Sequence, residues 1–259
     1  MHTEVSMHKE FDLTGKKAVV TGAGRGLGRG IAVGLARYGA DVTLWSRTVS
    51  ELEEKAALVR AEGRQAWIES IDVTDIESLD GAARKAKAAM GRVDILVNNA
   101  GTNKPQPAEA VDAATWDTIM NINAKGAFFC AQAFGKIMIE QQGGKIINMS
   151  SQSGKLAVLN RAVYCASKGA LDQFTRVMAY EWARHNITVN AVAPTFVETS
   201  MTANMLKDKT FSDYVFSKLR MPRLAKAEEV TAAVLYLAGS GADAVTGHIL
   251  YVDGGWTIH

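Results

Sequence analysis

Short runs of β-branched and apolar residues alternate along the chain with longer stretches in which apolar residues recur every three or four positions. The short runs predict strands at residues 17–21, 41–46, 65–71, 93–98, 145–150, 187–193 and 248–252. The longer stretches predict helices at residues 27–38, 50–62, 76–90, 115–141, 162–185 and 228–237. Strictly alternating strands and helices, with strands apolar along their length, indicate a parallel sheet covered on both faces. The pattern therefore predicts a single doubly wound α/β domain with a seven-stranded parallel sheet, a Rossmann fold.

Two segments depart from this alternation. Residues 195–223 carry scattered Met and aromatic side chains between charges, and we expect two short helices there. Such an adaptable segment fits a small lid over a substrate pocket, although ordinary helix packing would explain the same residues. Residues 1–10 are polar and are expected to form a flexible tail, so that the domain spans residues 11–259.

Composition excludes several classes of protein. The 259 residues are 47% hydrophobic and 22% charged with a formal net charge of +2, which argues against disorder and against nucleic acid or an anionic membrane as a partner. No apolar run approaches the roughly 18–20 residues of a membrane span, so a cytoplasmic protein is expected. Only two cysteines, Cys130 and Cys165, and five scattered histidines give no pattern for a disulfide scaffold or a metal site.

A cluster of glycines joins the first predicted strand to the helix after it. The segment reads TGAGRGLG, residues 21–28. Gly22, Gly26 and Gly28 permit a tight turn and a close approach of the backbone to a pyrophosphate at the helix N-terminus. A plain strand-to-helix turn is the alternative, because the spacing is neither that of a P-loop nor G-x-G-x-x-G.

The end of the second strand favours one dinucleotide over the other. An acidic residue there binds a free ribose 2′-hydroxyl, whereas an arginine accommodates a 2′-phosphate. This chain has Ser46 and Arg47 at that place, and Arg25 of the glycine cluster is a second cation nearby. We therefore expect NADP(H) to be preferred over NAD(H), unless Arg47 is simply a solvated loop residue.

Residues able to perform chemistry follow the later strands. An Asn-Asn-Ala-Gly segment, residues 98–101, and a pair of serines, Ser150 and Ser151, end two strands whose carboxyl ends should meet. Tyr164 and Lys168 lie four residues apart, on one face of a predicted helix. A cation about 4 Å from a phenol would lower the phenol pKa from about 10 by roughly three units, towards neutrality, where general acid–base catalysis works best.

Taken in order, these motifs resemble the short-chain dehydrogenase/reductase superfamily. The resemblance rests on TGxxxGxG, NNAG, the serine at a strand end and YxxxK, and it extends from Phe11 to the C-terminus through the closing VDGG, residues 252–255. Within the superfamily, the AGTNK stretch, the PTFVETxMT loop and the DGGW ending are most similar to gluconate 5-dehydrogenase and related sugar and sugar-acid dehydrogenases.

The resemblance implies a role for each matching residue. Tyr164 would exchange a proton with the substrate oxygen, while Lys168 would lower the pKa of Tyr164 and bind the nicotinamide ribose. Ser151 would bind the substrate oxygen, and Asn123 would hold a water that links Lys168 to solvent. The cofactor residues implied together by the motifs and the resemblance are Gly22, Arg25, Gly26, Leu27, Gly28, Ser46, Arg47, Asp72, Val73, Asn99, Ala100, Gly101, Tyr164, Lys168, Pro194, Val197 and Thr199. The superfamily usually has Gly where Thr195 stands, which makes the backbone of that loop uncertain.

The substrate is less clearly indicated. The residues expected near the pocket mouth are Asn103, Lys104, Ser151, Gln152, Lys155, Asn160, Arg161, Phe196 and Met201. Polar donors fit a polyhydroxylated substrate, and a lysine or Arg161 could pair with a carboxylate, although solvated loop charges would look the same. The resemblance implies a homotetramer, and the helices of residues 127–139 and 170–182 carry apolar residues around much of their surface.

The expected function is thus hydride transfer between NADP(H) and a secondary alcohol or ketone of a sugar or sugar acid. A 3-oxoacyl-[acyl-carrier-protein] reductase is the enzyme alternative, since it shares the same catalytic motifs. A non-catalytic NADP(H)-sensing protein is the alternative of another class.

Overall fold

Seven parallel strands form the centre of the computed structural model, which describes residues 8–198, 202, 204 and 206–258. Their order across the sheet is β3-β2-β1-β4-β5-β6-β7, as the doubly wound prediction requires. The strands are β1 (Lys17–Thr21), β2 (Asp41–Ser46), β3 (Ala66–Ser70), β4 (Ile95–Asn98), β5 (Gly144–Met149), β6 (Ile187–Pro194) and β7 (Ile249–Val252). The chain runs outward from β1 to β3 and then returns to β4 on the other side of β1. The carboxyl ends of β1 and β4 therefore flank the point where ligands bind in such sheets.

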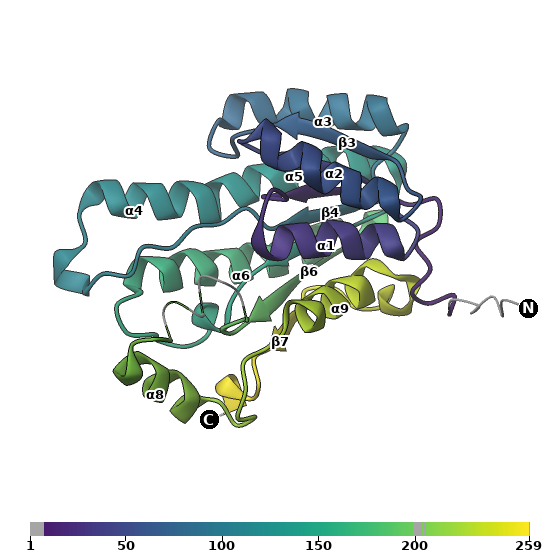
Figure 1. Ribbon diagram of the computed structural model, residues 1–259. Helices are drawn as coiled ribbons and strands as arrows, with labels where there is room; N and C mark the ends of the chain where they lie inside the picture. Colours follow the sequence, from purple (N-terminus) through teal and green to yellow (C-terminus); the bar gives the residue numbers. More distant parts are fainter. Residues whose placement is uncertain (1–7, 199–201, 203, 205, 259) are drawn as a thin grey trace, which may run out of the picture.

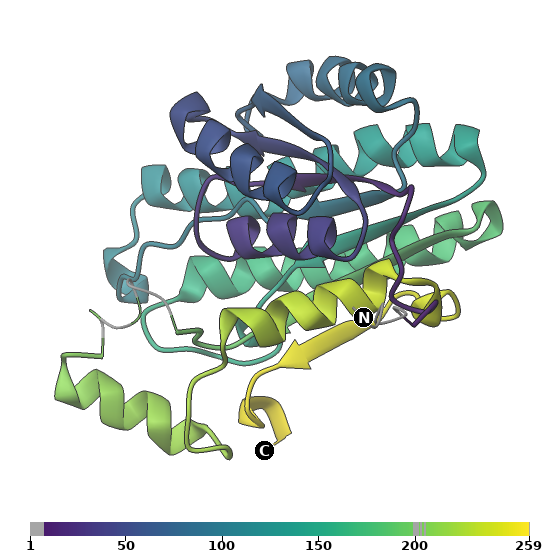
Figure 2. The same ribbon diagram turned by 45° about the vertical axis from the view of Figure 1, so that its right-hand side comes forward.

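Helices cover both faces of this sheet (Figures 1 and 2). One face carries α1 (Gly26–Arg37), α2 (Val49–Ala61) and α9 (Ala227–Ala238). The other carries α3 (Ile76–Met90), α5 (Ala127–Gln141) and α6 (Ala162–Trp182).

Alternation along β1 shows how the two cores arise. Ala18 and Val20 pack with the α1, α2 and α9 layer, whereas Val19 packs with the α3, α5 and α6 layer. Because successive side chains of a strand point to opposite faces, a strand buried on both faces must be apolar at every position. This explains why the sequence reads as continuous apolar runs.

The helix expected at residues 115–141 is interrupted in its hydrogen bonding. It consists of α4 (Ala113–Met120), a π-helical turn at Asn121–Gly126, and α5. A π turn widens a helix by one residue and is found mostly at functional positions. Here it contains Asn123, whose side chain is fully buried.

The insertion between β6 and α9 contains α8 (Lys209–Lys218), one of the two short helices expected there. The remainder of that expectation involves residues 199–201, 203 and 205, which lie outside the described residues. An isolated bridge between Val197 and Ala225 joins the two ends of the insertion. Figure 1 shows α8 below the main body, near the C-terminal segment. Within the described part of the chain, no helix is both long and apolar enough to cross a membrane.

Candidate active site

The glycine turn after β1 is fastened to the end of β4. Asn99 donates through Nδ2 to the carbonyl oxygens of Thr21 (3.0 Å) and Gly22 (3.1 Å). The Thr21 hydroxyl accepts from the backbone N–H groups of Asn99 and Ala100, both at 3.0 Å. The TG and NNAG motifs, which are far apart in sequence, therefore form one unit at the carboxyl ends of two adjacent strands.

Backbone geometry explains why three positions of this turn are glycine. Gly22 and Gly26 have φ values of +64° and +56°, in the left-handed region that disfavours side chains. At Gly28 a methyl group would overlap the Gly22 carbonyl oxygen and the Asn99 amide. No side chain caps α1 at Arg25, and its first turn carries no acidic residue. The first N–H groups of α1, which begins at Gly26 and continues with Leu27, are thus left for an anion.

The end of β2 brings both cations and a carboxylate near the glycine turn. Arg25, within the glycine turn, and Arg47, directly after β2, are both exposed. The prediction missed Glu51, in the first turn of α2. A methyl group at Gly24 would lie 2.7 Å from Glu51 Oε2 and 3.1 Å from Ser46 Oγ, so this carboxylate and hydroxyl share one small space. The only sign of Glu51 in the sequence was an acidic residue one helical turn after the end of the second strand.

Asp72 and Val73 follow β3 on the same edge of the sheet. Asp72 accepts hydrogen bonds from the Thr74 backbone N–H (2.9 Å) and hydroxyl (2.8 Å), and Val73 is buried. The hydrogen bonds to Thr74, with a smaller contribution from the Arg47 charge, lower the pKa of Asp72. Asp72 is therefore an ionised residue that shapes its own loop.

The first turns of α6 present Tyr164 and Lys168 to the carboxyl end of the sheet. Lys168 Nζ lies 5.7 Å from the centroid of the Tyr164 ring and donates to the Met149 carbonyl oxygen at 2.7 Å. Ser151 is hydrogen-bonded to the phenol of Tyr164. The Ser151 hydroxyl also donates to Gln152 Oε1 at 2.8 Å.

Gly101 is adjacent to this catalytic group. A methyl group there would lie 3.4 Å from Asn123 Oδ1 and 3.8 Å from Lys168 Nζ. The predicted catalytic residues and the NNAG motif are therefore brought to one place.

Burial reverses the expected pKa of the phenol. The Tyr164 pKa is raised because the side chain is removed from water, while the Ser151 hydrogen bond and the nearby Arg161 charge lower it to a lesser extent. The sequence argument, that Lys168 would bring this pKa towards neutrality, is wrong for the chain by itself. Its distance argument left out desolvation, which acts on both groups. A phenol with a raised pKa stays protonated, which is the form that donates a proton.

Lys168 shows the complementary effect. Burial lowers its pKa to about 8, and the charge of Asp172, one turn further along α6, acts in the opposite direction. Asp172 is itself buried, accepts a 2.5 Å hydrogen bond from the Ser150 hydroxyl and has a raised pKa owing to desolvation. Sequence reasoning missed Asp172, although its i, i+4 spacing from Lys168 was the available signal. Ser150 thus supports Asp172, and Ser151 contacts Tyr164.

Asn123 fastens the π turn to its surroundings. Its Oδ1 accepts from the Thr102 N–H at 2.8 Å, and its Nδ2 donates to the Thr102 carbonyl at 2.8 Å and to Ser167 Oγ at 3.1 Å. The side-chain amide hydrogens are used in holding the loop after β4 against α6. Asn123 therefore ties the loop after β4 to α6, the helix that carries Lys168.

The Asp172→Asn variant should change the pH dependence of the ketone reduction that the sequence predicts. The Asp172 carboxylate raises the pKa of Lys168, so its neutralisation lets Lys168 lose its proton at a lower pH. The decline in kcat/KM with rising pH should then begin at a lower pH than in the wild type. The measurement is a pH profile of kcat/KM, with Asp117→Asn on exposed α4 as the control. An unchanged profile would show that Asp172 does not act on Lys168, the lysine predicted to be catalytic.

Two of the predicted cofactor residues at the end of β6 and in the loop after it are among the described residues. Pro194 ends β6, and Val197 is buried at the bridge to Ala225. Thr195 does not have a positive φ and donates its N–H to the Val252 carbonyl oxygen at 3.2 Å, so the loop does not need the glycine. Thr199 and Met201, predicted for cofactor and substrate, lie outside the described residues.

The residues expected at the pocket mouth have different environments. Asn103 is exposed, and Gln152 is buried against Ser151. Asn160 adopts a left-handed φ of 59°, and its carbonyl accepts from the Gln106 N–H at 2.9 Å. Phe196 packs in an aromatic cluster with α8 and the C-terminal segment.

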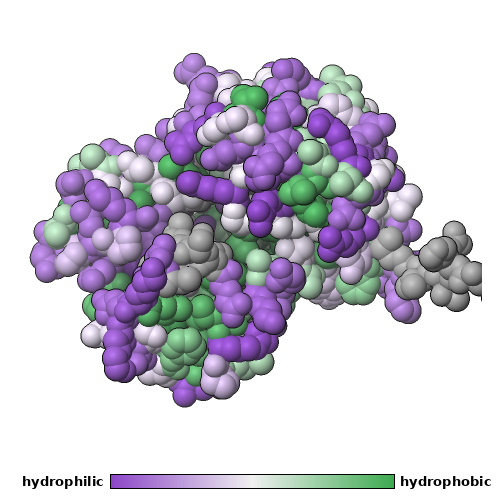
Figure 3. Space-filling view, viewed as in Figure 1, coloured by the Kyte–Doolittle hydropathy of each residue, from purple (hydrophilic) through white to green (hydrophobic). Residues whose placement is uncertain are grey.

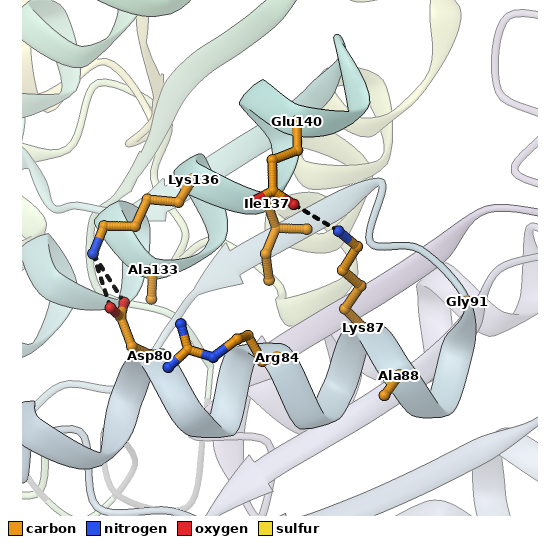
Figure 4. Close-up of a pocket in the computed structure, with 9 residues that line it drawn as sticks. All are labelled: Asp80, Arg84, Lys87, Ala88, Gly91, Ala133, Lys136, Ile137 and Glu140. Carbon is orange, nitrogen blue, oxygen red and sulfur yellow. Dashed lines mark hydrogen bonds and ion pairs between the residues drawn. The ribbon is translucent and has the colours of Figure 1, made fainter.

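A pocket elsewhere on the surface carries none of these residues. It has a volume of about 590 Å³ and lies between α3 and α5 (Figure 4). Two ion pairs cross it, Lys136 with Asp80 at 2.9 Å and Lys87 with Glu140 at 2.8 Å. The charges within these two pairs neutralise each other, and Arg84, which also lines the pocket, belongs to neither of them.

Comparison with known proteins agrees with this fold. The family described as Enoyl-(Acyl carrier protein) reductase matches residues 22–257. Gluconate 5-dehydrogenase from Gluconobacter oxydans is 38% identical over 96% of this chain and 97% of its own length. Galactitol 2-dehydrogenase from Rhizobium johnstonii is 38% identical over 98% of this chain and 99% of its own.

Solved structures give the same result. A gluconate 5-dehydrogenase from Burkholderia cenocepacia, in complex with NADP and tartrate, superposes with a TM-score of 0.93 at 36% identity, covering 97% of this chain and 98% of that one. An NAD⁺-bound xylitol dehydrogenase superposes with a TM-score of 0.90 at 29% identity, covering 94% of this chain and 99% of that one.

The fold and site define an oxidoreductase with a doubly wound dinucleotide-binding domain. The chain belongs to the short-chain dehydrogenase/reductase family. It is an enzyme of that family, whose relatives named above are dehydrogenases that act on alcohol and ketone groups.

Proposed function

We propose that this enzyme transfers a hydride between NADP(H) and a secondary alcohol or ketone of a sugar or sugar acid, with Tyr164 as the general acid and base. The observation that carries the proposal is the arrangement at the carboxyl end of the sheet, where Lys168 adjoins both Gly101 and Tyr164, and Ser151 adjoins Tyr164. The dehydrogenases of gluconate and galactitol among its relatives support the substrate class.

The residues present fit a dinucleotide. The uncapped N-terminus of α1 and the turn that excludes a side chain at Gly28 leave room and N–H groups for a pyrophosphate. When bound, NADP(H) supplies or accepts the hydride. The protein residues supply the proton and the orientation.

In ketone reduction, Tyr164 donates its phenolic proton to the carbonyl oxygen as the carbon receives the hydride. Its raised pKa keeps that proton in place beforehand. Ser151, which adjoins Tyr164, can donate to the same substrate oxygen once its hydroxyl turns away from Gln152 Oε1, and so help hold the carbonyl. The Lys168 ammonium stabilises the phenolate that remains, and alcohol oxidation runs the same steps in reverse.

The substrate class is tested by NADPH oxidation with keto-sugars, sugar keto-acids and acetoacetyl thioesters. Turnover of a sugar-derived ketone at least about 100-fold more efficient than of the thioester is expected. The reverse preference would favour a 3-oxoacyl-[acyl-carrier-protein] reductase. No turnover with any of the three classes would contradict the proposed reaction.

We also propose that NADP(H) is preferred over NAD(H). The exposed Arg25 and Arg47 support this preference, and β2 ends in Ser46 rather than a carboxylate. NADP is bound in the Burkholderia structure, although the xylitol dehydrogenase holds NAD⁺. Glu51 acts against the preference, since a carboxylate near Ser46 would repel a 2′-phosphate.

Two single substitutions should therefore shift NADPH affinity in opposite directions. Arg47→Gln should weaken NADPH binding about tenfold, the effect of losing one charge-assisted contact at an exposed site. Glu51→Gln should strengthen NADPH binding, because it removes a like charge. NADH affinity should change little in Arg47→Gln. Fluorescence titration with both cofactors measures these affinities, and tenfold tighter NADH than NADPH binding by the wild type would contradict the preference.

We propose that the protein is a homotetramer. On α6, Val177 and Tyr180 are 46% and 89% exposed, more than apolar side chains on a helix of an isolated domain usually are. These residues support an interface along that helix.

A further inference from the structure

Three cations near the pocket mouth could bind an anionic group of the substrate, and the structure separates them. Lys104 Nζ donates to Thr115 Oγ1 at 3.0 Å. Lys155 Nζ donates to the Thr257 carbonyl oxygen at 3.2 Å and lies 5.4 Å from the centroid of the Tyr251 ring. Each lysine is exposed and uses one of its three N–H donors on a neutral oxygen. Arg161 differs from both because it is buried.

Arg161 is a buried charge without a counter-charge. It is 8% exposed, and among the described residues its guanidinium has neither a hydrogen bond nor an ion pair. The groups whose charge acts on it are two phenols and a thiol, those of Tyr164, Tyr214 and Cys165, and not a carboxylate. Desolvation by burial lowers the pKa of Arg161, and no carboxylate opposes this effect. An unpaired buried cation costs free energy that a bound anion would recover.

The aromatic cluster fixes the position of this guanidinium. The Arg161 Cζ atom lies 5.7 Å from the centroid of the Phe196 ring. Phe196 in turn packs on Trp256 at 5.7 Å and on Phe211 at 5.5 Å between ring centroids. Figure 3 shows apolar side chains gathered in this region, beside α8. Contact with a ring uses none of the five N–H donors of arginine, so these stay available for a planar anion.

Arg161 also adjoins the catalytic phenol. It directly precedes α6, one helical turn before Tyr164, and its charge is among those that lower the Tyr164 pKa. An anionic group bound at Arg161 would thus belong to the same molecule whose carbonyl meets Tyr164.

We propose that Arg161 binds the carboxylate of the substrate, so that this enzyme acts on a sugar acid in preference to an uncharged polyol or ketose. The inference rests on the proposed hydride transfer at Tyr164 and specifies its substrate. Arginine suits this task because its guanidinium can donate two parallel hydrogen bonds to one carboxylate. An uncharged substrate would leave Arg161 buried and unpaired.

Binding to the enzyme–NADPH complex tests the inference without turnover. The probes are D-gluconate and D-glucitol, which differ only in a carboxylate or a hydroxymethyl group at C1. By calorimetry, the wild type should bind D-gluconate about 100-fold more tightly than D-glucitol. Arg161→Gln should remove about 100-fold of the D-gluconate affinity and change that for D-glucitol less than threefold. Arg60→Gln, on exposed α2, is the matched control and should behave as the wild type.

Several results would overturn the inference. These are equal binding of the two probes by the wild type, unchanged D-gluconate binding in Arg161→Gln, and an equal loss for both probes. NADPH affinity and melting temperature show whether Arg161→Gln is folded. If it is not, Arg161→Lys decides, since it keeps the charge but not the planar pair of donors. It should lose about tenfold for D-gluconate alone.

The kinetic counterpart separates this inference from the proposed function. 5-Keto-D-gluconate and L-sorbose are the matching ketones, again differing only in the carboxylate. Arg161→Gln should raise KM about 100-fold for 5-keto-D-gluconate and leave that for L-sorbose within threefold. If neither ketone is reduced by the wild type, the proposed function fails for these substrates, while the binding experiment still decides the role of Arg161.

Discussion

Tyr164→Phe is expected to lower kcat for ketone reduction by at least about 1000-fold while NADPH binds with nearly unchanged affinity. The substitution removes one hydroxyl, and with it the proton donor, whose contribution in general acid catalysis is typically 10²–10⁴-fold. The hydroxyl also makes the hydrogen bond to Ser151. Steady-state kinetics and NADPH fluorescence titration measure the two quantities.

Tyr38→Phe is the matched control for this variant. Tyr38 follows α1 and packs against the core on the opposite face of the sheet from α6, so its hydroxyl is remote from the chemistry. It should leave kcat and NADPH affinity unchanged. If Tyr164→Phe kept more than about one tenth of the wild-type kcat, Tyr164 would not be the general acid.

Gly28→Ala should impair cofactor binding and stability together. The added methyl group would overlap the Gly22 carbonyl oxygen and the Asn99 amide, so the turn after β1 and the end of β4 must move apart. We expect at least a tenfold weaker affinity for NADPH and a loss of about 1–3 kcal/mol in the free energy of unfolding. Titration with NADPH and urea unfolding measure these changes.

Gly30→Ala, two residues further along α1, controls for the chemistry of the substitution. A methyl group there has only Thr231 Oγ1 within 4 Å, at an ordinary 3.6 Å. This variant should bind NADPH normally and gain about 0.5–1 kcal/mol, because alanine favours a helix interior more than glycine does. Equal NADPH affinities for the two variants would contradict the close packing proposed for the turn.

The parts predicted well from the sequence have local causes. The strands follow from apolar runs, because a strand buried on both faces must be apolar throughout. The i, i+4 spacing of Tyr164 and Lys168 places them on one helical face wherever that helix packs. The Gly22 turn depends on the backbone of a few consecutive residues.

The parts missed depend on contacts between distant elements. Glu51 reaches the space beside Ser46 because α2 packs next to the glycine turn. Asp172, whose charge acts on the Lys168 pKa, is held by a hydrogen bond from the Ser150 hydroxyl, which comes from another element. The π turn around Asn123 is likewise specified by its hydrogen bonds to Thr102 and Ser167, and not by periodicity.

The sequence by itself determined the doubly wound fold, the family resemblance and the order of the residues in the site. These are properties of spacing, which the backbone geometry of helices and strands converts directly into position. Only the tertiary structure decided the direction of the Tyr164 pKa and which of three cations is left without a partner. Both depend on removal of charge from water and on partners that come from separate parts of the chain. Desolvation is a sum over the whole surroundings, and spacing along a sequence does not contain that sum.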